Sequence, residues 1–165
     1  MPRAAVEQRV WEIAATVVDP ELPVLTIEDL GILRRVSVDD DGIRVEITPT
    51  YSGCPAIEAI RADVLGALAA DGFAEASVEF VLSPAWTTDW MSAAGRDKLR
   101  DYGITPPRGT AAAEPSGPVR LSLAVKCPRC DSLDTREIAR FGSTSCKALY
   151  ECRACLEPFD YFKVL

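Results

Sequence analysis

Two stretches of the chain carry apolar residues at steps of three and four. The first runs from Ala4 to Val18 and predicts an amphipathic helix, because this spacing lines one helical face. It ends at Asp19-Pro20, since a residue that precedes proline is pushed out of the helical region. The second runs from Pro55 to Ala70 and begins with a proline, which suits the first position of a helix. We therefore predict a second helix over this range.

Three further stretches have the pattern of β-strands. Ile32–Val38 and Ile43–Thr48 are separated by an aspartate-rich turn that ends in glycine, which can take positive φ in a hairpin. In the second strand apolar and polar residues alternate, so one face of the sheet is expected to be buried. Ala76–Leu82 gives a third strand, and Ala93–Arg100 a short helix. This order predicts a small α+β domain over residues 1–104 with its helices on one sheet face.

A change of composition separates this domain from the rest of the chain. Residues 105–118 contain four prolines, two glycines and a run of alanines without a core pattern, which is typical of an interdomain linker. Strand patterns resume in residues 119–165, near Thr135–Ile138, near Lys147–Tyr150 and in the aromatic stretch close to the end. We expect these strands to form a second, smaller domain.

Two Cys-x-x-Cys pairs mark this second domain as a β zinc ribbon. Cys127 and Cys130 form the first pair, and Cys152 and Cys155 form the second, with twenty-one residues between the pairs. Each short loop can turn two thiolates inward, and four thiolates complete the closed tetrahedral shell of a structural zinc site. Four thiolates also suit iron, so the spacing alone leaves the metal open. Two disulfides or four ordinary core thiols are the alternatives, and neither accounts for the matched spacing.

The composition excludes several classes of function. The chain has no histidine, which removes Ser-His-Asp and Cys-His catalysis and histidine-ligated zinc hydrolysis. Residues 1–118 hold ten Lys/Arg against nineteen Asp/Glu, and residues 119–165 hold eight against six, which gives the net charge of −7. This acidic balance without a dense basic stripe disfavours nucleic-acid binding. The sequence shows neither a leader pattern nor an apolar run that could span a membrane, so we expect a cytoplasmic protein.

Cys54 is the candidate reactive residue of the first domain. It lies in the segment 51–55, immediately before the second predicted helix and close to its N-cap. There the helix dipole and the unpaired N–H groups favour a thiolate, which is both a nucleophile and a soft metal ligand. We therefore expect a lowered pKa for the Cys54 thiol. The alternative is a buried, inert cysteine at a tight turn.

Other polar residues allow more than one interpretation. Asp19 and Glu21 flank a proline and could bind a metal, or one could raise the pKa of the other. The alternative is a solvated turn in which a carboxylate caps local N–H groups, and Asp29 has the same ambiguity. Cys146, six residues before Cys152, lies outside the spacing of the two pairs, and we expect it to be a structural thiol.

Together these motifs resemble a known family. Asp19-Pro20-Glu21, Asp29-Leu30-Gly31 and the segment TPTYSGCP at 48–55 are similar to the small domain of iron–sulfur cluster assembly factors, including SufT-like proteins, over about residues 5–105. The tail motifs CPRC, FGSTSCKALYEC and RACLEPFDYF resemble one branch of that family, the D subunit (PaaD, also called PaaJ) of bacterial phenylacetyl-CoA epoxidase. The two resemblances occur in the same order and together cover nearly the whole chain.

The resemblance implies an accessory role in aerobic phenylacetate degradation. Other subunits of the multicomponent phenylacetyl-CoA 1,2-epoxidase carry the di-iron oxygenase and the reductase, and the D subunit would assist assembly of an iron or iron–sulfur centre in a partner subunit without being catalytic itself. By motif position Cys54 matches the family's reactive cysteine, and Asp19 and Glu21 match its acidic signature. These three residues are the candidates for transient handling of iron or a cluster. The alternative is a non-catalytic adaptor that holds the oxygenase complex together.

Overall fold

The computed structural model describes residues 2–108 and 124–164 of the chain. The chain divides into two compact units, residues 1–95 and 96–165, and each contains one β-sheet. Together the units combine helices and strands, so the α+β class expected from the sequence is confirmed. Among the helices of the described ranges, none has the length and apolar character that crossing a bilayer requires.

The boundary between the units falls earlier in the chain than predicted. Strand β4 (Ile104–Thr105) pairs in parallel with β7 (Pro158–Phe162) of the second unit, although the sequence assigned residue 104 to the first domain. A two-residue strand is too short for its pattern to be recognised in a sequence. Of the predicted linker, residues 109–118 lie outside the described residues, as do residues 119–123 of the strand expected after it.

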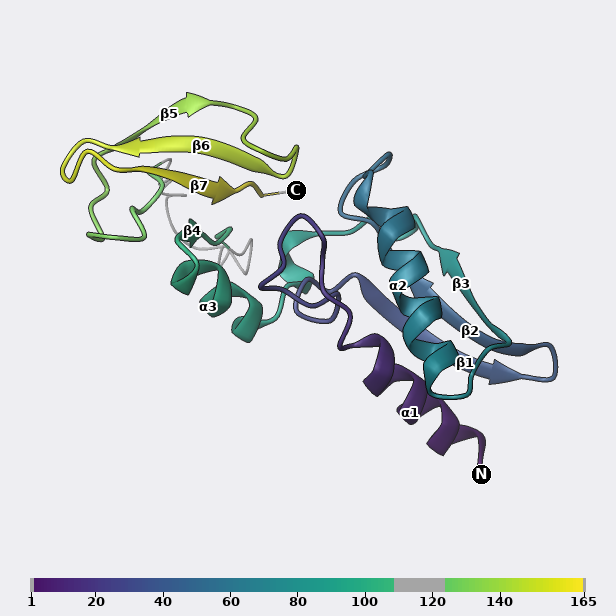
Figure 1. Cartoon of the computed structure of the whole chain (residues 1–165). Coiled ribbons are helices and arrows are strands. Elements are labelled where there is room, and N and C mark those ends of the chain that lie inside the picture. Colours follow the sequence, from purple (N-terminus) through teal and green to yellow (C-terminus); the bar gives the residue numbers. More distant parts are fainter. Residues whose placement is uncertain (1, 109–123, 165) are drawn as a thin grey trace, which may run out of the picture. The chain divides into compact units, whose positions relative to one another are not determined.

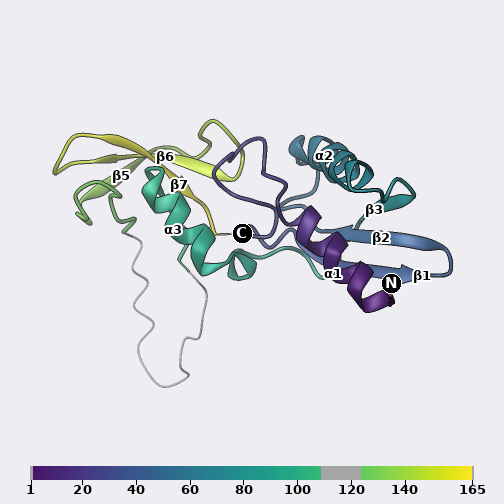
Figure 2. The ribbon, with the colours of Figure 1, turned by 60° about the horizontal axis from the view of Figure 1, so that its bottom comes forward.

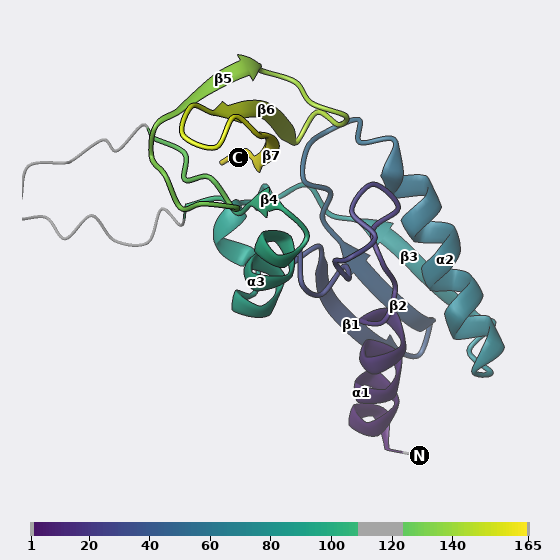
Figure 3. The same cartoon turned by 60° about the vertical axis from the view of Figure 1, so that its left-hand side comes forward.

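The first unit is organised around a three-stranded sheet (Figures 1 and 3). The strands stand in the order β1-β2-β3, with β1 and β2 antiparallel and β2 and β3 parallel. Helix α2 makes the crossover that a parallel pair requires. The elements of this unit are α1 (Arg3–Ala14), β1 (Leu33–Asp39), β2 (Gly42–Ile47), α2 (Ala56–Ala70), β3 (Ala76–Phe80) and the 3-10 helix η1 (Thr88–Trp90).

The two faces of this sheet differ in polarity, as the alternation in the sequence predicted. Val45 and its cross-strand neighbour Val78 are buried on one face, whereas Arg44 pairs with Glu79 on the other. Helix α2 contacts β3 and buries an apolar stripe of its own, formed by Ile60, Val64 and Leu68. Because burying one such side chain fully is worth about 1.5–3 kcal/mol, this stripe fixes the helix on the sheet.

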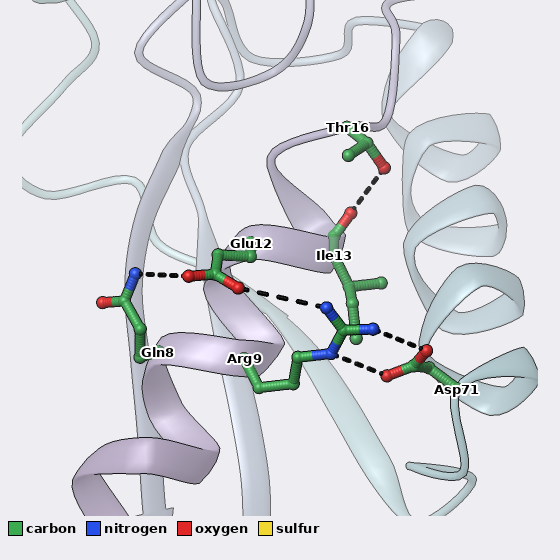
Figure 4. Close-up of polar contacts among 6 residues, drawn as sticks. All are labelled: Gln8, Arg9, Glu12, Ile13, Thr16 and Asp71. Atoms are coloured by element: carbon green, nitrogen blue, oxygen red, sulfur yellow. Dashed lines mark hydrogen bonds and ion pairs between the residues drawn. The ribbon is translucent and has the colours of Figure 1, made fainter.

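Helix α1 ends earlier than the predicted limit at Val18. It stops at Ala14, and Val18 forms an extended bridge with Thr26. After Ala15 come three β-branched residues, and the first of them, Thr16, donates its hydroxyl to the carbonyl oxygen of Ile13 at 2.7 Å (Figure 4). A side chain that bonds the backbone locally competes with the helical pattern, which gives the early end.

An ion pair ties α1 to the end of α2. The Arg9 guanidinium donates from Nε and Nη2 to the two carboxylate oxygens of Asp71, at 3.0 and 2.9 Å, and Asp71 is the C-cap of α2 (Figure 4). The pair is exposed, so its contribution to stability is modest, about 0–1 kcal/mol. The pair links the two helices at the surface of the unit.

The segment after β3 closes onto the loop before β1. The Trp86 indole donates to the carbonyl oxygen of Leu30 at 2.9 Å, and Trp86 is buried, as expected for a packing residue. Gly31 has φ +71°, and a Cβ there would lie 2.3 Å from the carbonyl oxygen of Trp90. Only glycine fits this close approach. The Arg34 guanidinium stacks over the Trp90 ring, 3.5 Å from its centroid.

The second unit contains a four-stranded sheet in the order β4-β7-β6-β5. Strands β5, β6 and β7 form an antiparallel meander and run side by side in Figure 2, which confirms the strands predicted near these positions. Its buried core includes Cys127 and Cys152, one from each Cys-x-x-Cys pair, with Val125 and Phe159. The remaining elements are α3 (Ala93–Asp101), whose first three residues still belong to the first unit, β5 (Thr135–Ala139) and β6 (Lys147–Cys152).

Candidate functional site

The two Cys-x-x-Cys loops of the second unit have the same local geometry. The backbone N–H of Cys127 donates to the carbonyl oxygen of Ser132 at 2.9 Å, and that of Cys152 donates to Glu157 at 3.0 Å, five residues further on in both cases. The residue after each pair, Asp131 or Leu156, has a left-handed backbone with φ of 61° or 62°. Matched turns of this kind point both thiols of each loop toward a shared centre.

The four ribbon sulfurs fit a tetrahedral metal ion. All four lie within 4.8 Å of one another, with Cys127 to Cys155 at 3.8 Å and Cys130 to Cys152 at 3.5 Å. A zinc ion bound by four thiolates at about 2.3 Å requires sulfurs about 3.8 Å apart. The pKa of Cys152 is lowered to about 7, chiefly because the backbone N–H of Cys155 donates to its sulfur. The donor set is closed and entirely sulfur, which is the arrangement of a structural site.

Cys54 stands apart from this cluster, in the first unit at the entrance to α2. Its N–H donates to the carbonyl oxygen of Tyr51 at 3.3 Å, and its carbonyl accepts from Ile57 at 3.3 Å. Pro55 is the N-cap of α2, one residue later than Cys54. Only 9% of the Cys54 surface is exposed to solvent. The preceding Gly53, with φ +86°, is exposed. The thiol is therefore largely covered but lies at the edge of the fold.

The lowered pKa expected for Cys54 is wrong: the pKa of its thiol is raised. Burial is the largest cause, because it disfavours the thiolate. The N–H of Ala56 and the hydroxyl of Tyr51 bond the sulfur and act in the opposite direction, and the charges of Glu21 and Asp19 raise the pKa further. The position at the helix entrance was predicted correctly, but the sequence could not show how much surface the loop removes from water.

The acidic loop and Cys54 are brought together by the fold. Asp19 is buried, and its Oδ1 accepts the N–H groups of Glu21 and Leu22 at 2.7 and 2.9 Å. This carboxylate thus caps a local turn, as the alternative interpretation proposed, but it is buried and not solvated. Both Asp19 and Glu21 also act electrostatically on the Cys54 thiol. A metal ion needs at least three Cys, Asp, Glu or His side chains close together. Within residues 2–108 and 124–164, the four ribbon cysteines meet this condition. Cys54 and the acidic loop do not form a comparably compact set.

Asp29 has a different place in the structure. Its Oδ2 accepts the N–H of Thr26 at 3.1 Å while its own N–H donates to the Thr26 hydroxyl at 3.1 Å. The Ser92 hydroxyl donates to Oδ1 at 3.2 Å. These bonds hold together the loop before β1 and the segment that leads into α3, so Asp29 supports the scaffold of the first unit.

Tyr51 is a site residue that the sequence analysis did not single out. Its hydroxyl bonds the Cys54 sulfur, and its backbone closes the turn that places this sulfur. The same loop borders a cavity of about 200 Å³ that is also lined by Trp86. The signal was present in the sequence, because Tyr51 precedes Cys54 by three residues, the spacing of a tight turn.

Cys146 lies outside the sulfur cluster. It is buried, and the Thr144 hydroxyl lies 3.0 Å from its sulfur. This environment agrees with the structural thiol that we expected, and it makes Cys146 a matched control for substitutions at the other cysteines.

Alkylation should report the raised pKa of Cys54. Because only the thiolate reacts, modification by iodoacetamide at pH 8 is expected to be slower than that of free cysteine and to increase as the pH rises through 9. Glu21→Gln removes a charge that raises the pKa of the Cys54 thiol, so it should accelerate the reaction at pH 8, by about two- to fivefold. Site-resolved mass spectrometry measures the rate. Glu75→Gln, at an exposed site near β3, should leave the rate unchanged, and a plateau below pH 8 would contradict the assignment.

Two family models match the chain, one in each half. Residues 7–80 match the model described as "Iron-sulfur cluster assembly protein". Residues 111–163 match the model described as "PaaD zinc beta ribbon domain". The first match contains the acidic loop and Cys54, and the second contains the four cysteines of the ribbon.

Curated and solved proteins agree with these matches. The chain is 47% identical over 156 residues to the putative D subunit of the 1,2-phenylacetyl-CoA epoxidase of Escherichia coli, a match that covers 94% of this chain and 92% of that protein. It is 41% identical over 78 residues to "Fe-S protein maturation auxiliary factor SufT" of Staphylococcus aureus, covering 46% of this chain and 88% of that protein. The crystal structure of "Domain of Unknown Function DUF59 from Bacillus anthracis" covers 59% of this chain and 93% of that chain, with a TM-score of 0.54 at 29% identity.

Proposed function

The chain belongs to the family of the 1,2-phenylacetyl-CoA epoxidase D subunit, and from this membership we propose that it assists assembly of an iron or iron–sulfur centre in another subunit of that epoxidase. Relatives of its first unit are named as maturation factors for iron–sulfur proteins, which supports the same role. The client would be the oxygenase or the reductase subunit. The chain itself would not epoxidise the substrate.

The observation that carries this proposal is the contrast between two thiol sites. Four ribbon sulfurs form a closed set that would hold a resident zinc ion and stabilise the fold of the second unit. Cys54 offers one sulfur at the edge of the first unit, next to the negative charges of Asp19 and Glu21. A closed set retains its metal, whereas a single thiol with open coordination positions can release a metal to a better set of ligands.

The cargo, iron or a small cluster, would be held by Cys54 as substrate and not as a resident cofactor. The Cys54 thiol must lose its proton to bind a metal cation, and the cation's own charge drives this loss. In the metal-free protein the carboxylates of Asp19 and Glu21 disfavour the Cys54 thiolate by charge repulsion. Once a cation is bound, the same carboxylates would attract it. The N–H of Ala56 and the Tyr51 hydroxyl would hold the sulfur in place while ligands from the client complete the coordination.

The test is the iron content of the epoxidase subunits made in the presence of this protein. Oxygenase and reductase co-expressed with the wild-type chain should contain several-fold more iron than those co-expressed with Cys54→Ser, while the variant keeps the wild-type fold because only one atom changes. Cys146→Ser serves as the matched control and should support loading like wild type. If the oxygenase and reductase contain their full iron when they are co-expressed with Cys54→Ser, the proposal is wrong. A stable stoichiometric complex together with full loading would instead favour an adaptor.

A further inference from the structure

The second unit contains a cavity that the proposed handling of iron does not use. Its volume is about 280 Å³, close to the lower limit for small-molecule sites. Its walls come from α3, from Thr105 and the three residues that follow it, from the stretch 125–131 that contains the first Cys-x-x-Cys loop, and from Tyr161 in β7. All of the lining residues belong to residues 96–165, so the cavity lies within one compact unit.

Hydrogen bonds between separate segments hold the cavity open in one shape. Thr105 pairs with Tyr161 across the parallel strands β4 and β7, and its hydroxyl donates to the carbonyl oxygen of Lys126 at 2.7 Å. The guanidinium of Arg96 donates to the carbonyl oxygen of Pro107, and that of Arg108 donates to the carbonyl oxygen of residue 124. Two cationic side chains of the lining are thus anchored to the backbone, and such preorganisation lowers the entropic cost of binding a ligand.

The charge of the lining is unusual for this chain. Its cations are Arg96, Arg100, Arg108 and Lys126; its negative groups are Asp131 and, when zinc is bound, the Cys127 thiolate, so the cations remain in excess. The whole chain has a net charge of −7, so positive charge is concentrated at this cavity against the overall balance. The ion pairs of Arg100 with Asp97 and of Lys126 with Asp131 are exposed, and exposed pairs exchange partners at little cost.

We propose that this cavity binds a small molecule that carries a phosphate group. Guanidinium groups match phosphate oxygens in a bidentate geometry, and several cations favour a multiply charged anion over a singly charged carboxylate. The rest of the lining includes Pro106, Pro107, Pro128 and the ring of Tyr161, which offer an apolar surface to the remainder of the ligand. The zinc ribbon would then recognise a phosphorylated metabolite in addition to stabilising its own fold.

Calorimetric titration of the full, zinc-loaded chain tests this inference, with ADP, inorganic phosphate and acetate as probes at constant ionic strength. ADP is expected to bind with a Kd of roughly 1 mM or tighter, phosphate more weakly and acetate without saturation. Arg100→Gln and Arg108→Gln should each weaken ADP binding about tenfold, the usual scale for losing a hydrogen bond to a charged group. Arg136→Gln changes the charge equally in β5, where Arg136 pairs with Glu151 outside the cavity, and should leave the Kd unchanged.

Three results would overturn the inference. They are the absence of saturable binding by both ADP and phosphate, an equal loss of affinity in Arg136→Gln, and tighter, competing binding of a glutamate-rich peptide. The last would make the cavity a docking site for an acidic protein segment. None of these measurements depends on Cys54, so the inference and the proposed role in iron handling can fail separately.

Discussion

Cys152→Ser is expected to abolish zinc binding and to unfold the second unit. Cys152 is fully buried in the ribbon core, and its sulfur is one of the four that face a common centre. A serine hydroxyl is a poor replacement for a thiolate, and loss of one ligand opens the tetrahedral shell. Structural zinc contributes about 10–16 kcal/mol of apparent binding free energy in zinc-finger peptides, which equals or exceeds the whole stability of an ordinary domain. The sheet of the ribbon has too small an apolar core to compensate.

Zinc analysis and circular dichroism measure this effect. Wild-type protein should carry one zinc ion per chain, matching the four-sulfur group found among the described residues, and Cys152→Ser should carry none. Cys146→Ala, which changes a buried cysteine outside that group, should keep its zinc. Full zinc content and an unchanged ribbon in Cys152→Ser would show that the four sulfurs do not act together.

Elements with a long periodic pattern were predicted well from the sequence. Helix α2 and the β1–β2 hairpin appear at the expected positions, because their apolar residues follow the period of the element over many residues. The end of α1 was missed because the bond from Thr16 to Ile13 depends on a side-chain conformation. Strand β4 was missed because its two residues are extended only through pairing with a strand far along the chain.

Part of the candidate site could also be predicted from the sequence. Cysteine spacing gave the sulfur cluster, since the local geometry of a Cys-x-x-Cys loop is nearly independent of context. The family resemblance named both the acidic loop and Cys54 as candidates, but their proximity came from the fold, because the two segments are distant in sequence. The pKa of Cys54 was predicted with the wrong sign, since burial is a property of the packed loop and outweighs the hydrogen bonds at the helix entrance. The cationic cavity was not foreseen, because its walls come from four separate segments.

Cys54→Ser is expected to remove all iron that the purified protein can hold, without affecting its zinc. Cys54 supplies a sulfur that lies outside the ribbon and close to the carboxylates of Asp19 and Glu21. Without this sulfur, the two carboxylates offer oxygen ligands, which have little preference for iron over other cations. Serine keeps the shape of the turn between Tyr51 and α2 but is not deprotonated by a metal as readily as a thiol. The fold and the ribbon should therefore be unchanged, and the loss should be confined to exchangeable iron.

The most direct measurement is an anaerobic metal analysis of wild-type protein and Cys54→Ser after incubation with ferrous iron and sulfide and removal of unbound ions. The wild type should retain zinc together with a smaller amount of iron that a chelator removes readily, and Cys54→Ser should retain the same zinc and no iron. Equal iron in the two proteins, or iron that leaves only when the ribbon cysteines are replaced, would contradict a transient metal site at Cys54.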